Sequence, residues 1–405
     1  MGVNRNVVPS DTHTHRSHRS GSAVAGILLC LALAAGPVWS HAASSPAQVR
    51  VTLVTASVPG DDPTVVVDAA RGLRDAQRAF AGRAVVSRIS LRTTGAEIAA
   101  TKGAPPQLRA ALLRAALSSN LVIAWGDPLT DVALDAARAY PRIHFVLVSA
   151  VYVTQLPPNV TQGSFEDTAE AFLAGAAAAM QSRSQAIGFI GPLDRGPQKI
   201  GYRAGAYYAN ARTRVITDFL GVSRALLGND RDLPPSWIGA RFAGASEPTF
   251  HDARKAEEVA LAQYDRGVDV IYVMAGASAA GVYRAAVSRR GWVMDQGGVS
   301  PAAHYPPAWR DRRLMTTTER PDLAVYHLVA QSVEGIALPH RLVWGLTYPQ
   351  PPQPMIGFAL DAGPGARSGA VGSFLGKILE QIRAEKLVVP YGTEQLAEFF
   401  KQYPP

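Results

Sequence analysis

The sequence predicts an α/β protein built from two halves, and three observations support this prediction. Short runs rich in Val, Ile and Leu alternate along the chain with longer Ala-rich runs of helical period. The short runs are apolar nearly throughout, as parallel strands covered on both faces should be. The chain of 405 residues is 47% apolar and only 18% charged, which is typical of a globular protein with a sizeable core. Two doubly wound parallel sheets follow from this pattern.

The first 42 residues have the pattern of a secretory signal peptide. Three Arg residues precede an uncharged run over 23–35, and a Gly-Pro pair and small residues then lead to Ala42. That run is shorter than the roughly 20 residues that a membrane-spanning helix needs, so a permanent anchor is the weaker interpretation. We expect cleavage after Ala42 and a soluble periplasmic product. Cys30, the single Cys, is then removed, so the mature chain forms no disulfide.

The first half is expected to contain four strands and three helices. The strands are expected at 49–55, 84–91, 120–125 and 144–149, and the helices at 64–80, 106–118 and 131–140. Pro141 stops the last of these helices, because proline cannot continue the hydrogen-bond pattern.

The second half repeats this alternation without a detectable sequence repeat. Its strands are expected at 186–190, 215–219, 237–242 and 268–274, and its helices at 166–181, 199–211, 253–265 and 279–289. Two amphipathic helices are expected near the end of the sequence, at 372–385 and 393–401. The Pro-rich stretches 230–237, 301–309 and 348–354 are expected to be surface loops or extended connections.

The composition and the motifs argue against several classes of function. Removing the first 42 residues takes away three Arg and one Asp from a net charge of +8, which leaves +6. The basic residues are scattered rather than interleaved with aromatic ones, so no nucleic-acid partner is expected. Neither the Cys content nor the His spacing suits a metal site, and no cofactor motif is present. In the segment 276–281, the serine does not have a glycine two places away on each side, as a nucleophile elbow requires, and strand ends carry no paired catalytic groups. We therefore expect a protein that is not an enzyme.

Turns rich in Gly and small polar residues remain as candidates for ligand contact. They are Trp125-Gly126-Asp127, 188–191 and 275–281, each between an expected strand and an expected helix. Small residues let a ligand approach the backbone, and the first turn of a helix offers free N–H donors. The alternative is that these residues serve only the geometry of tight turns.

Read together, these segments resemble the basic membrane protein family of extracytoplasmic solute-binding proteins, whose better-known members bind purine nucleosides for ABC transporters. The resemblance extends over about 48–375 and is carried by ordered motifs. There are four such motifs. The first is 125–148, and the second is Pro158-Asn159-Val160 followed by Phe165 and 170–176. The third is 187–191 followed by Gly201 and Gly205, and the fourth is 267–272 followed by Ala275-Gly276.

The resemblance implies a type I periplasmic-binding-protein fold, in which two lobes are joined by a three-stranded hinge. Lobe one would comprise 48–163 with 297–345, and lobe two 164–296 with 346–405. The chain would cross between lobes near Thr161, Asp295 and Leu346.

The function that the resemblance implies is that of the solute-binding protein of an ABC importer. A monomer would capture a small ligand by hinge closure and present it to a permease in the inner membrane, with no bond made or broken. The alternative is a periplasmic sensing protein whose loaded form meets a receptor or a sensor kinase.

The family's nucleoside binders carry an Asp-x-Ser-Phe-Asn run, and this chain departs from it. The corresponding residues are Asp62-Pro63-Thr64-Val65-Val66, so the stacking ring and the amide that reads a base are absent there. The ligand is thus expected to be purine nucleoside-like or another small polar or aromatic solute. Tyr152 and Trp292, like the two aromatic residues among the candidates, are either replacement rings or core residues. The candidate ligand-binding residues are Asp62, Thr64, Trp125, Gly126, Asp127, Ser149, Phe165, Gly276, Ser278 and Asp295.

Overall fold

The computed structural model describes most of the chain that follows the expected signal peptide. The described residues are 48–57, 63–94, 97, 105–149, 153–191, 196–220, 252–297, 306–346, 354–361 and 365–404. The signal peptide with Cys30, the candidate Asp62 and the expected strand at 237–242 lie outside these ranges. None of the helices in the described ranges combines the length and the apolar character that crossing a membrane requires.

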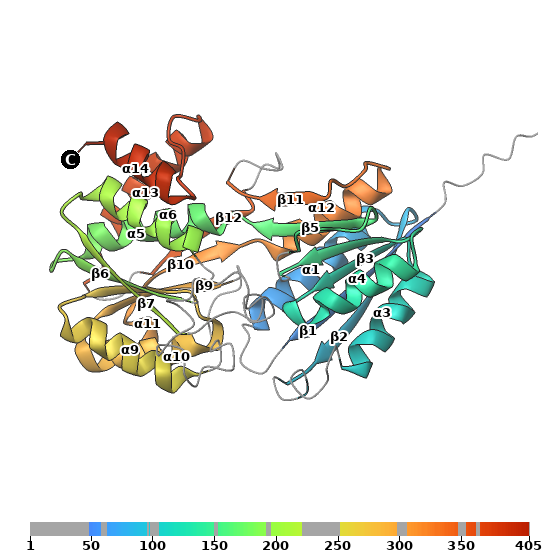
Figure 1. Ribbon diagram of the computed structural model, residues 1–405, viewed down its shortest axis with the longest axis horizontal. Coiled ribbons are helices and arrows are strands. Elements are labelled where there is room, and N and C mark those ends of the chain that lie inside the picture. The colour runs from blue at the N-terminus through green and yellow to red at the C-terminus, as the bar shows by residue number, and fades with distance from the viewer. Residues whose placement is uncertain are drawn as a thin grey trace, which may run out of the picture. The chain divides into compact units, whose positions relative to one another are not determined.

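The first sheet has six strands in the order β11-β5-β4-β3-β1-β2, and all neighbouring pairs are parallel (Figure 1). Its strands are β1 Val49–Ser57, β2 Ala84–Arg92, β3 Leu121–Trp125, β4 His144–Val148, β5 Val160–Phe165 and β11 Arg341–Trp344. Its helices are α1 Pro63–Ala79, α3 Pro106–Ser118, α4 Thr130–Ala139 and α12 Pro321–Val333, and a 3-10 turn, η1 Asp127–Leu129, precedes α4.

Alternate residues of each strand enter the two cores of this sheet. In β3, Ile123 packs with α1 and α12, whereas Val122 packs with α3 and α4 on the other face. Both are fully buried, which explains why the strand sequence is apolar without interruption.

The second sheet also has six strands, in the order β12-β10-β9-β8-β6-β7. Its strands are β6 Ala186–Gly191, β7 Arg214–Phe219, β8 Val270–Val273, β9 Trp292–Gly297, β10 Arg313–Glu319 and β12 Ile356–Leu360. Its helices are α5 Asp167–Gln181, α6 Gly196–Ala209, α9 Ala253–Asp265, α10 Ala279–Arg289, α11 Pro307–Arg310, α13 Ser368–Arg383 and α14 Thr393–Gln402, and a 3-10 turn, η3 Gly276–Ser278, precedes α10. Tyr272 of β8 packs with α5 and α6, and its neighbour Ile271 packs with α9 and α10 on the opposite face.

The two sheets share one strand order. In each, the first strand in sequence lies between the second and the third, and the fourth and fifth strands follow outward. The sixth strand differs, because β11 is parallel to β5 whereas β12 is antiparallel to β10. The prediction of an α/β fold with two doubly wound parallel sheets is confirmed. The order of the strands reverses between β1 and β3 and between β6 and β8, and ligands of doubly wound sheets bind at such points.

Glycines of the family-like motifs let α5 and α6 pack closely. A Cβ atom at Gly175 would lie 2.0 Å from the backbone oxygen of Tyr202, and one at Gly205 would lie 1.9 Å from that of Phe172. Both distances are far below van der Waals contact, so only glycine fits at these two positions. These glycines therefore maintain helix packing in the second core.

The chain passes between the sheets three times, and the three passages are joined by backbone hydrogen bonds. Glu166 follows β5, and its N–H donates to the oxygen of Trp344 (2.9 Å). The Met355 N–H donates to the oxygen of Gly345 (3.2 Å), and the Arg320 N–H donates to the oxygen of Met355 (2.9 Å). Each passage is thus bonded to a neighbouring one, as in the three-stranded hinge that we expected.

The second passage lies elsewhere than expected. The sequence suggested that the chain leaves lobe two near Asp295 and that 297–345 belongs with lobe one. However, β9 and β10 pair in parallel within the second sheet, and the chain leaves that sheet only after Glu319. The crossing that the resemblance implied was placed one strand too early, because β10 follows β9 as a further strand of the second sheet. The first passage, expected near Thr161, begins after β5, to which Thr161 itself belongs.

Candidate functional site

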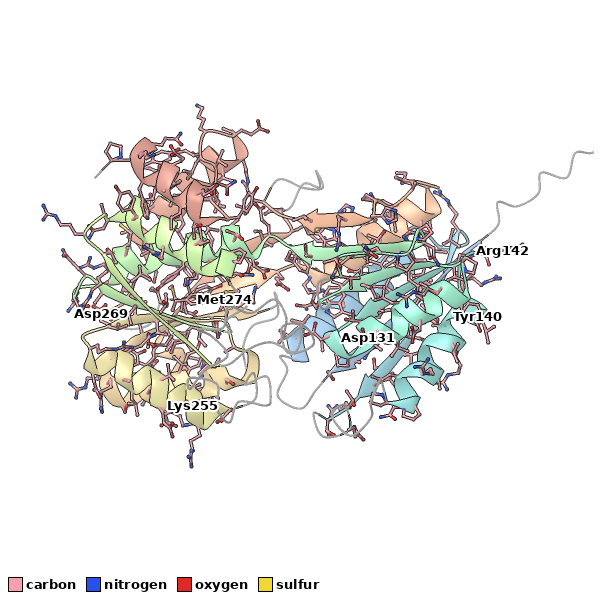
Figure 2. The ribbon with its side chains drawn as sticks, viewed as in Figure 1. Asp131, Tyr140, Arg142, Lys255, Asp269 and Met274 are labelled. Carbon is pink, nitrogen blue, oxygen red and sulfur yellow. The ribbon has the colours of Figure 1, made fainter. Side chains whose placement is uncertain are left out.

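Most of the described candidate residues lie at or just after the carboxyl ends of parallel strands. The carboxyl ends of parallel strands share one edge of their sheet, and the helices that follow begin at that edge. Figure 2 labels Asp269 and Met274, which flank β8 and lie at its two opposite ends. Met274 marks the carboxyl end, and the candidates Gly276 and Ser278 follow it in the chain. In the first sheet, Asp131 marks the start of α4 at the corresponding edge.

Gly126 lies at the strand-order reversal of the first sheet. Its φ of +114° is a conformation that residues with a Cβ rarely adopt, and a Cβ would lie 2.3 Å from the backbone oxygen of Ala56. Its N–H donates to Val148 at the end of β4 (3.0 Å). Gly126 therefore holds the ends of three neighbouring strands together. Asp127, which is exposed, begins the 3-10 turn that follows.

The two aromatic candidates pack in the core beneath this edge. Trp125 and Phe165 end β3 and β5, with 2% and 8% of their surface exposed. The ring centroids of Trp125 and Phe165 are 6.4 Å apart, and Trp344 at the end of β11 lies 5.2 Å from Phe165. Of the two roles that the sequence allowed for these rings, stacking on a ligand or packing in the core, the contacts match packing in the core. Trp292 begins β9 and thus lies at the opposite edge, and Tyr152 lies outside the described residues.

The first turn of α1 contains the residues that the sequence analysis aligned with the family's Asp-x-Ser-Phe-Asn run. Thr64, Val65 and Val66 are all partly buried there, and all three have short side chains. Ser149 follows β4, is exposed, and has a φ of +48°. These residues offer hydroxyl groups and small apolar surface at the edge of the first sheet.

In the second sheet, Gly276 is exposed at the turn after β8, whereas Ser278 is fully buried. The Ser278 hydroxyl accepts a hydrogen bond from the backbone N–H of Asp252 (3.0 Å), just before α9 begins. This contact joins the starts of two helices, and therefore gives Ser278 a structural role.

Asp295 lies within β9, with 3% of its surface exposed. Tyr283 donates to one carboxylate oxygen (2.7 Å), and Thr316 donates to the other (2.7 Å). The Tyr283 ring in turn stacks on Trp309, with centroids 5.3 Å apart and planes at 8°. Both oxygens of Asp295 are thus engaged by neighbouring strands and helices, and this arrangement stabilises the second lobe internally.

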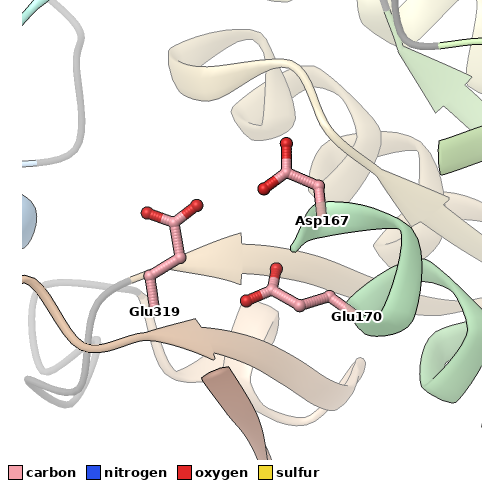
Figure 3. A group of neighbouring side chains, drawn as sticks. All are labelled: Asp167, Glu170 and Glu319. Atoms are coloured by element: carbon pink, nitrogen blue, oxygen red, sulfur yellow. The ribbon is translucent and has the colours of Figure 1, made fainter. Parts of the chain in front are cut away.

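The sequence reasoning missed an acidic cluster at the carboxyl edge of the second sheet. Asp167 and Glu170 belong to the first turn of α5, and Glu319 ends β10 (Figure 3). One carboxylate oxygen from each of the three residues lies within 4.8 Å of the others. Gln296 of β9 donates to Glu170 (2.9 Å) and to Glu319 (3.1 Å). The sequence gives no sign of this cluster, because Glu319 is far from Asp167 and Glu170 in the chain.

The electrostatics of this cluster centre on Glu170, which is fully buried. Burial raises the pKa of Glu170 well above its ordinary value, and the negative charges of Glu319 and Asp167 raise it further. The hydrogen bond from Gln296 and the nearby Thr317 hydroxyl lower the pKa of Glu170, but they do not offset burial. The cluster thus favours either a proton or a bound cation.

The resemblance noted in the sequence is confirmed by comparison with known proteins. Residues 66–222 match the family model described as ABC transporter substrate-binding protein PnrA-like. The chain is 30% identical over 174 residues to basic membrane protein D of Borreliella burgdorferi (strain JD1), which is 42% of this chain and 43% of that protein. It is 31% identical over 164 residues to the ABC transporter nucleoside-binding protein BmpA of Lactococcus lactis subsp. cremoris (strain MG1363), covering 40% and 39% of the two chains. The matched region thus spans about two fifths of these relatives.

Solved structures show the same fold over most of the chain. An ABC transporter solute-binding protein from Conexibacter woesei DSM 14684 superposes with a TM-score of 0.59 at 18% identity, covering 85% of this chain and 99% of that one. A transcriptional activator of the comK gene from Bacillus halodurans superposes with a TM-score of 0.58 at 17% identity, covering 82% and 97%. The fold is therefore that of periplasmic-binding-protein type solute-binding proteins.

Proposed function

We propose that this protein is the extracytoplasmic solute-binding component of an ABC importer. It captures a small ligand by closing about the hinge, and presents the closed form to a permease in the inner membrane. It acts as a periplasmic monomer after cleavage of its signal peptide, and it makes or breaks no bond.

The observation that carries this proposal is the extent of the family match. Residues 66–222 include strands β2 to β5 of the first sheet, the first passage between sheets, and strands β6 and β7 of the second sheet. The match therefore covers β3, whose end leads into the Gly126 turn, as well as one segment of the hinge. The hydrogen-bonded passages support hinge motion, because a few residues at each passage can absorb the change in φ and ψ.

The ligand class follows from the edges of the two sheets. The first sheet offers hydroxyl groups and small apolar side chains, together with backbone N–H groups in the first turn of α1. The second offers carboxylates at the first turn of α5 and at Glu319. A ligand that carries hydroxyl or cationic groups on one side and a compact apolar body on the other would suit both. A purine nucleoside meets this description, as do other small polar or aromatic solutes.

A thermal-shift screen tests the proposal. The full chain is expressed with its first 42 residues, recovered from the periplasm, and screened with nucleosides, nucleobases, amino acids, sugars and aromatic acids at about 1 mM. A micromolar ligand at this concentration adds about 4 kcal/mol to the free energy of unfolding, and raises the melting temperature by several degrees. Mass spectrometry of the recovered protein should find Ala43 as its first residue.

A rise with one class of solute supports solute capture and names the class. The absence of a rise with every class, confirmed by calorimetric titration of the same solutes, would contradict the proposed function. Retention of residues 1–42 in the recovered protein would contradict the localisation.

A further inference from the structure

The acidic cluster of Asp167, Glu170 and Glu319 has the chemistry of a cation site. Its three carboxylates supply only oxygen ligands, which Ca²⁺ and Mg²⁺ prefer in proteins. Two ligands on opposite sides of an ion lie twice the metal–ligand distance apart, which is about 4.6–5.2 Å for Ca²⁺ and about 4.0–4.2 Å for Mg²⁺. The three carboxylate oxygens lie within 4.8 Å of one another, so they can all reach one Ca²⁺ ion.

A second observation points to a ligand at this position. The Oε1 atom of Glu170 is buried and has no hydrogen-bond partner among the described residues, and the whole side chain is 0% exposed. Figure 3 shows its carboxylate directed toward the carboxylates of Asp167 and Glu319. A buried carboxylate oxygen without a partner is costly, and a cation coordinated by it would remove that cost.

A neutral amide side chain also contacts the cluster. Gln198 of α6 donates its Nε2 to Asp167 (2.9 Å), and its own Oε1 is buried without a partner among the described residues. With 8% of its surface exposed, the Gln198 side chain is held against the cluster. An amide oxygen is a ligand that Ca²⁺ accepts together with carboxylates.

We propose that Asp167, Glu170 and Glu319 bind one divalent cation, with Ca²⁺ favoured over Mg²⁺. The site joins the first turn of α5 to the end of β10. Asp167 directly follows Glu166 in the first passage between sheets, and Glu319 directly precedes Arg320 in the second. A bound cation therefore ties two of the three hinge segments together on the side of the second lobe.

Calorimetric titration of the full chain tests this proposal. The protein is stripped with EDTA and dialysed, and CaCl₂ and MgCl₂ are titrated separately at constant ionic strength set with KCl. We expect one Ca²⁺ per chain, weaker binding of Mg²⁺, and a higher melting temperature in Ca²⁺ than in KCl of equal ionic strength.

Two variants and a control assign the site. Glu170→Gln and Asp167→Asn keep the size of each side chain, and are expected to abolish Ca²⁺ binding and the thermal shift. Glu334→Gln removes an exposed carboxylate at the end of α12, and should bind Ca²⁺ as the parent protein does. Circular dichroism in EDTA establishes that the variants are folded.

Three results would overturn the proposal. The first is the absence of Ca²⁺ binding at millimolar concentration by the parent protein. The second is unchanged binding in both Glu170→Gln and Asp167→Asn. The third is equal loss of binding in Glu334→Gln, which would show a diffuse effect of charge. Solute binding in the thermal-shift screen is scored separately without added Ca²⁺, so failure of this proposal is distinguishable from failure of the proposed function.

Discussion

Val65 and Val66, in the first turn of α1, decide whether this chain stacks a base there. Both are partly buried, so a larger side chain at these positions would extend from the carboxyl edge of the first sheet. Val65 and Val66 are aliphatic, whereas the corresponding residues of the run in the family's nucleoside binders are Phe and Asn. The ligand therefore depends on a few side chains that the fold does not specify.

Restoring the family's pair at these positions should increase affinity for purine nucleosides. We expect the double variant Val65→Phe with Val66→Asn to gain about 1–3 kcal/mol of binding free energy from stacking, which lowers Kd by a factor of roughly 5 to 150. Calorimetric titration with adenosine and guanosine measures this gain. Val67→Phe is the matched control, because Val67 is 53% exposed on the same helical turn. Equal affinities for all three proteins would contradict the expectation.

His144 should make stability depend on pH. Its Nε2 lies 2.9 Å from the Thr161 hydroxyl, which itself donates to the oxygen of Pro339 (2.7 Å), so Nε2 carries the proton. Burial, and then the neighbouring His340, lower the pKa of His144 from its ordinary value of 6.5. The folded chain thus binds fewer protons than the unfolded chain, and stability is lost as the pH falls below about 6.5.

Urea unfolding at pH 7.5 and pH 5.5 tests this expectation. His144→Gln should lose less stability than the parent protein between the two pH values. Thr161→Val is the control, because it removes the hydrogen-bond partner without removing a titratable group, and should keep the parent's dependence on pH. The same pH dependence in His144→Gln as in the parent would show that other groups are responsible.

The sequence predicted that the candidate site lies at the carboxyl ends of the parallel strands. It predicted only some of the residues found there. It placed Gly126 at the turn after β3, where the positive φ requires glycine. It could not separate ligand contacts from internal contacts, because Ser278 and Asp295 owe their structural roles to partners distant in the chain. For the same reason, the carboxylates around Glu170 gave no signal.

At the scale of elements, every expected strand within the described residues is present, whereas several strands were missed, among them polar ones. The strand β5 has the sequence VTQGSF and was not predicted. Its Gly163 is required because a Cβ would lie 2.4 Å from the ring of Trp344, which belongs to a strand near the end of the sequence. The segment β10 through α12 was missed for a related reason, since the strand is rich in threonine and follows a Pro-rich stretch.

The close packing of α5 on α6 predicts a specific loss of stability. Gly205→Ala should destabilise the protein by about 1–3 kcal/mol, because the added Cβ would overlap the backbone oxygen of Phe172. Gly376→Ala is the matched control in α13, where nothing lies within 4 Å of an added Cβ. It should be neutral or stabilising by up to about 1 kcal/mol. Urea unfolding measures both, and equal stabilities would show that α5 and α6 can separate without cost.

At the scale of the whole molecule, an ion-pair network lies where the chain enters α12 from the second sheet. The Asp322 carboxylate accepts from Arg320 (2.9 Å) and from Arg71 of α1 (3.0 Å). Arg320 also bonds through its backbone to Met355 in the third passage. The network thus joins the hinge to the first lobe.

Removing the shared carboxylate should destabilise the protein. We expect Asp322→Asn to lose about 1–3 kcal/mol, which is less than the loss of a fully buried pair would cost because Arg71 is partly exposed. Asp75→Asn is the control, since the Asp75–Arg78 pair is largely exposed and should change stability little. Thermal and urea unfolding measure both variants. A loss in Asp75→Asn as large as that in Asp322→Asn would show that net charge, rather than the network, is responsible.

The sixth strand of each sheet determines when that sheet can be completed during synthesis. The outer edge of β5 pairs with β11, which the ribosome makes only after all of the second sheet except β12. Until then, β5 is an edge strand with unpaired backbone groups. The second sheet in turn awaits β12, so neither sheet is complete until late in translation. Such a chain stays incompletely folded while it is made.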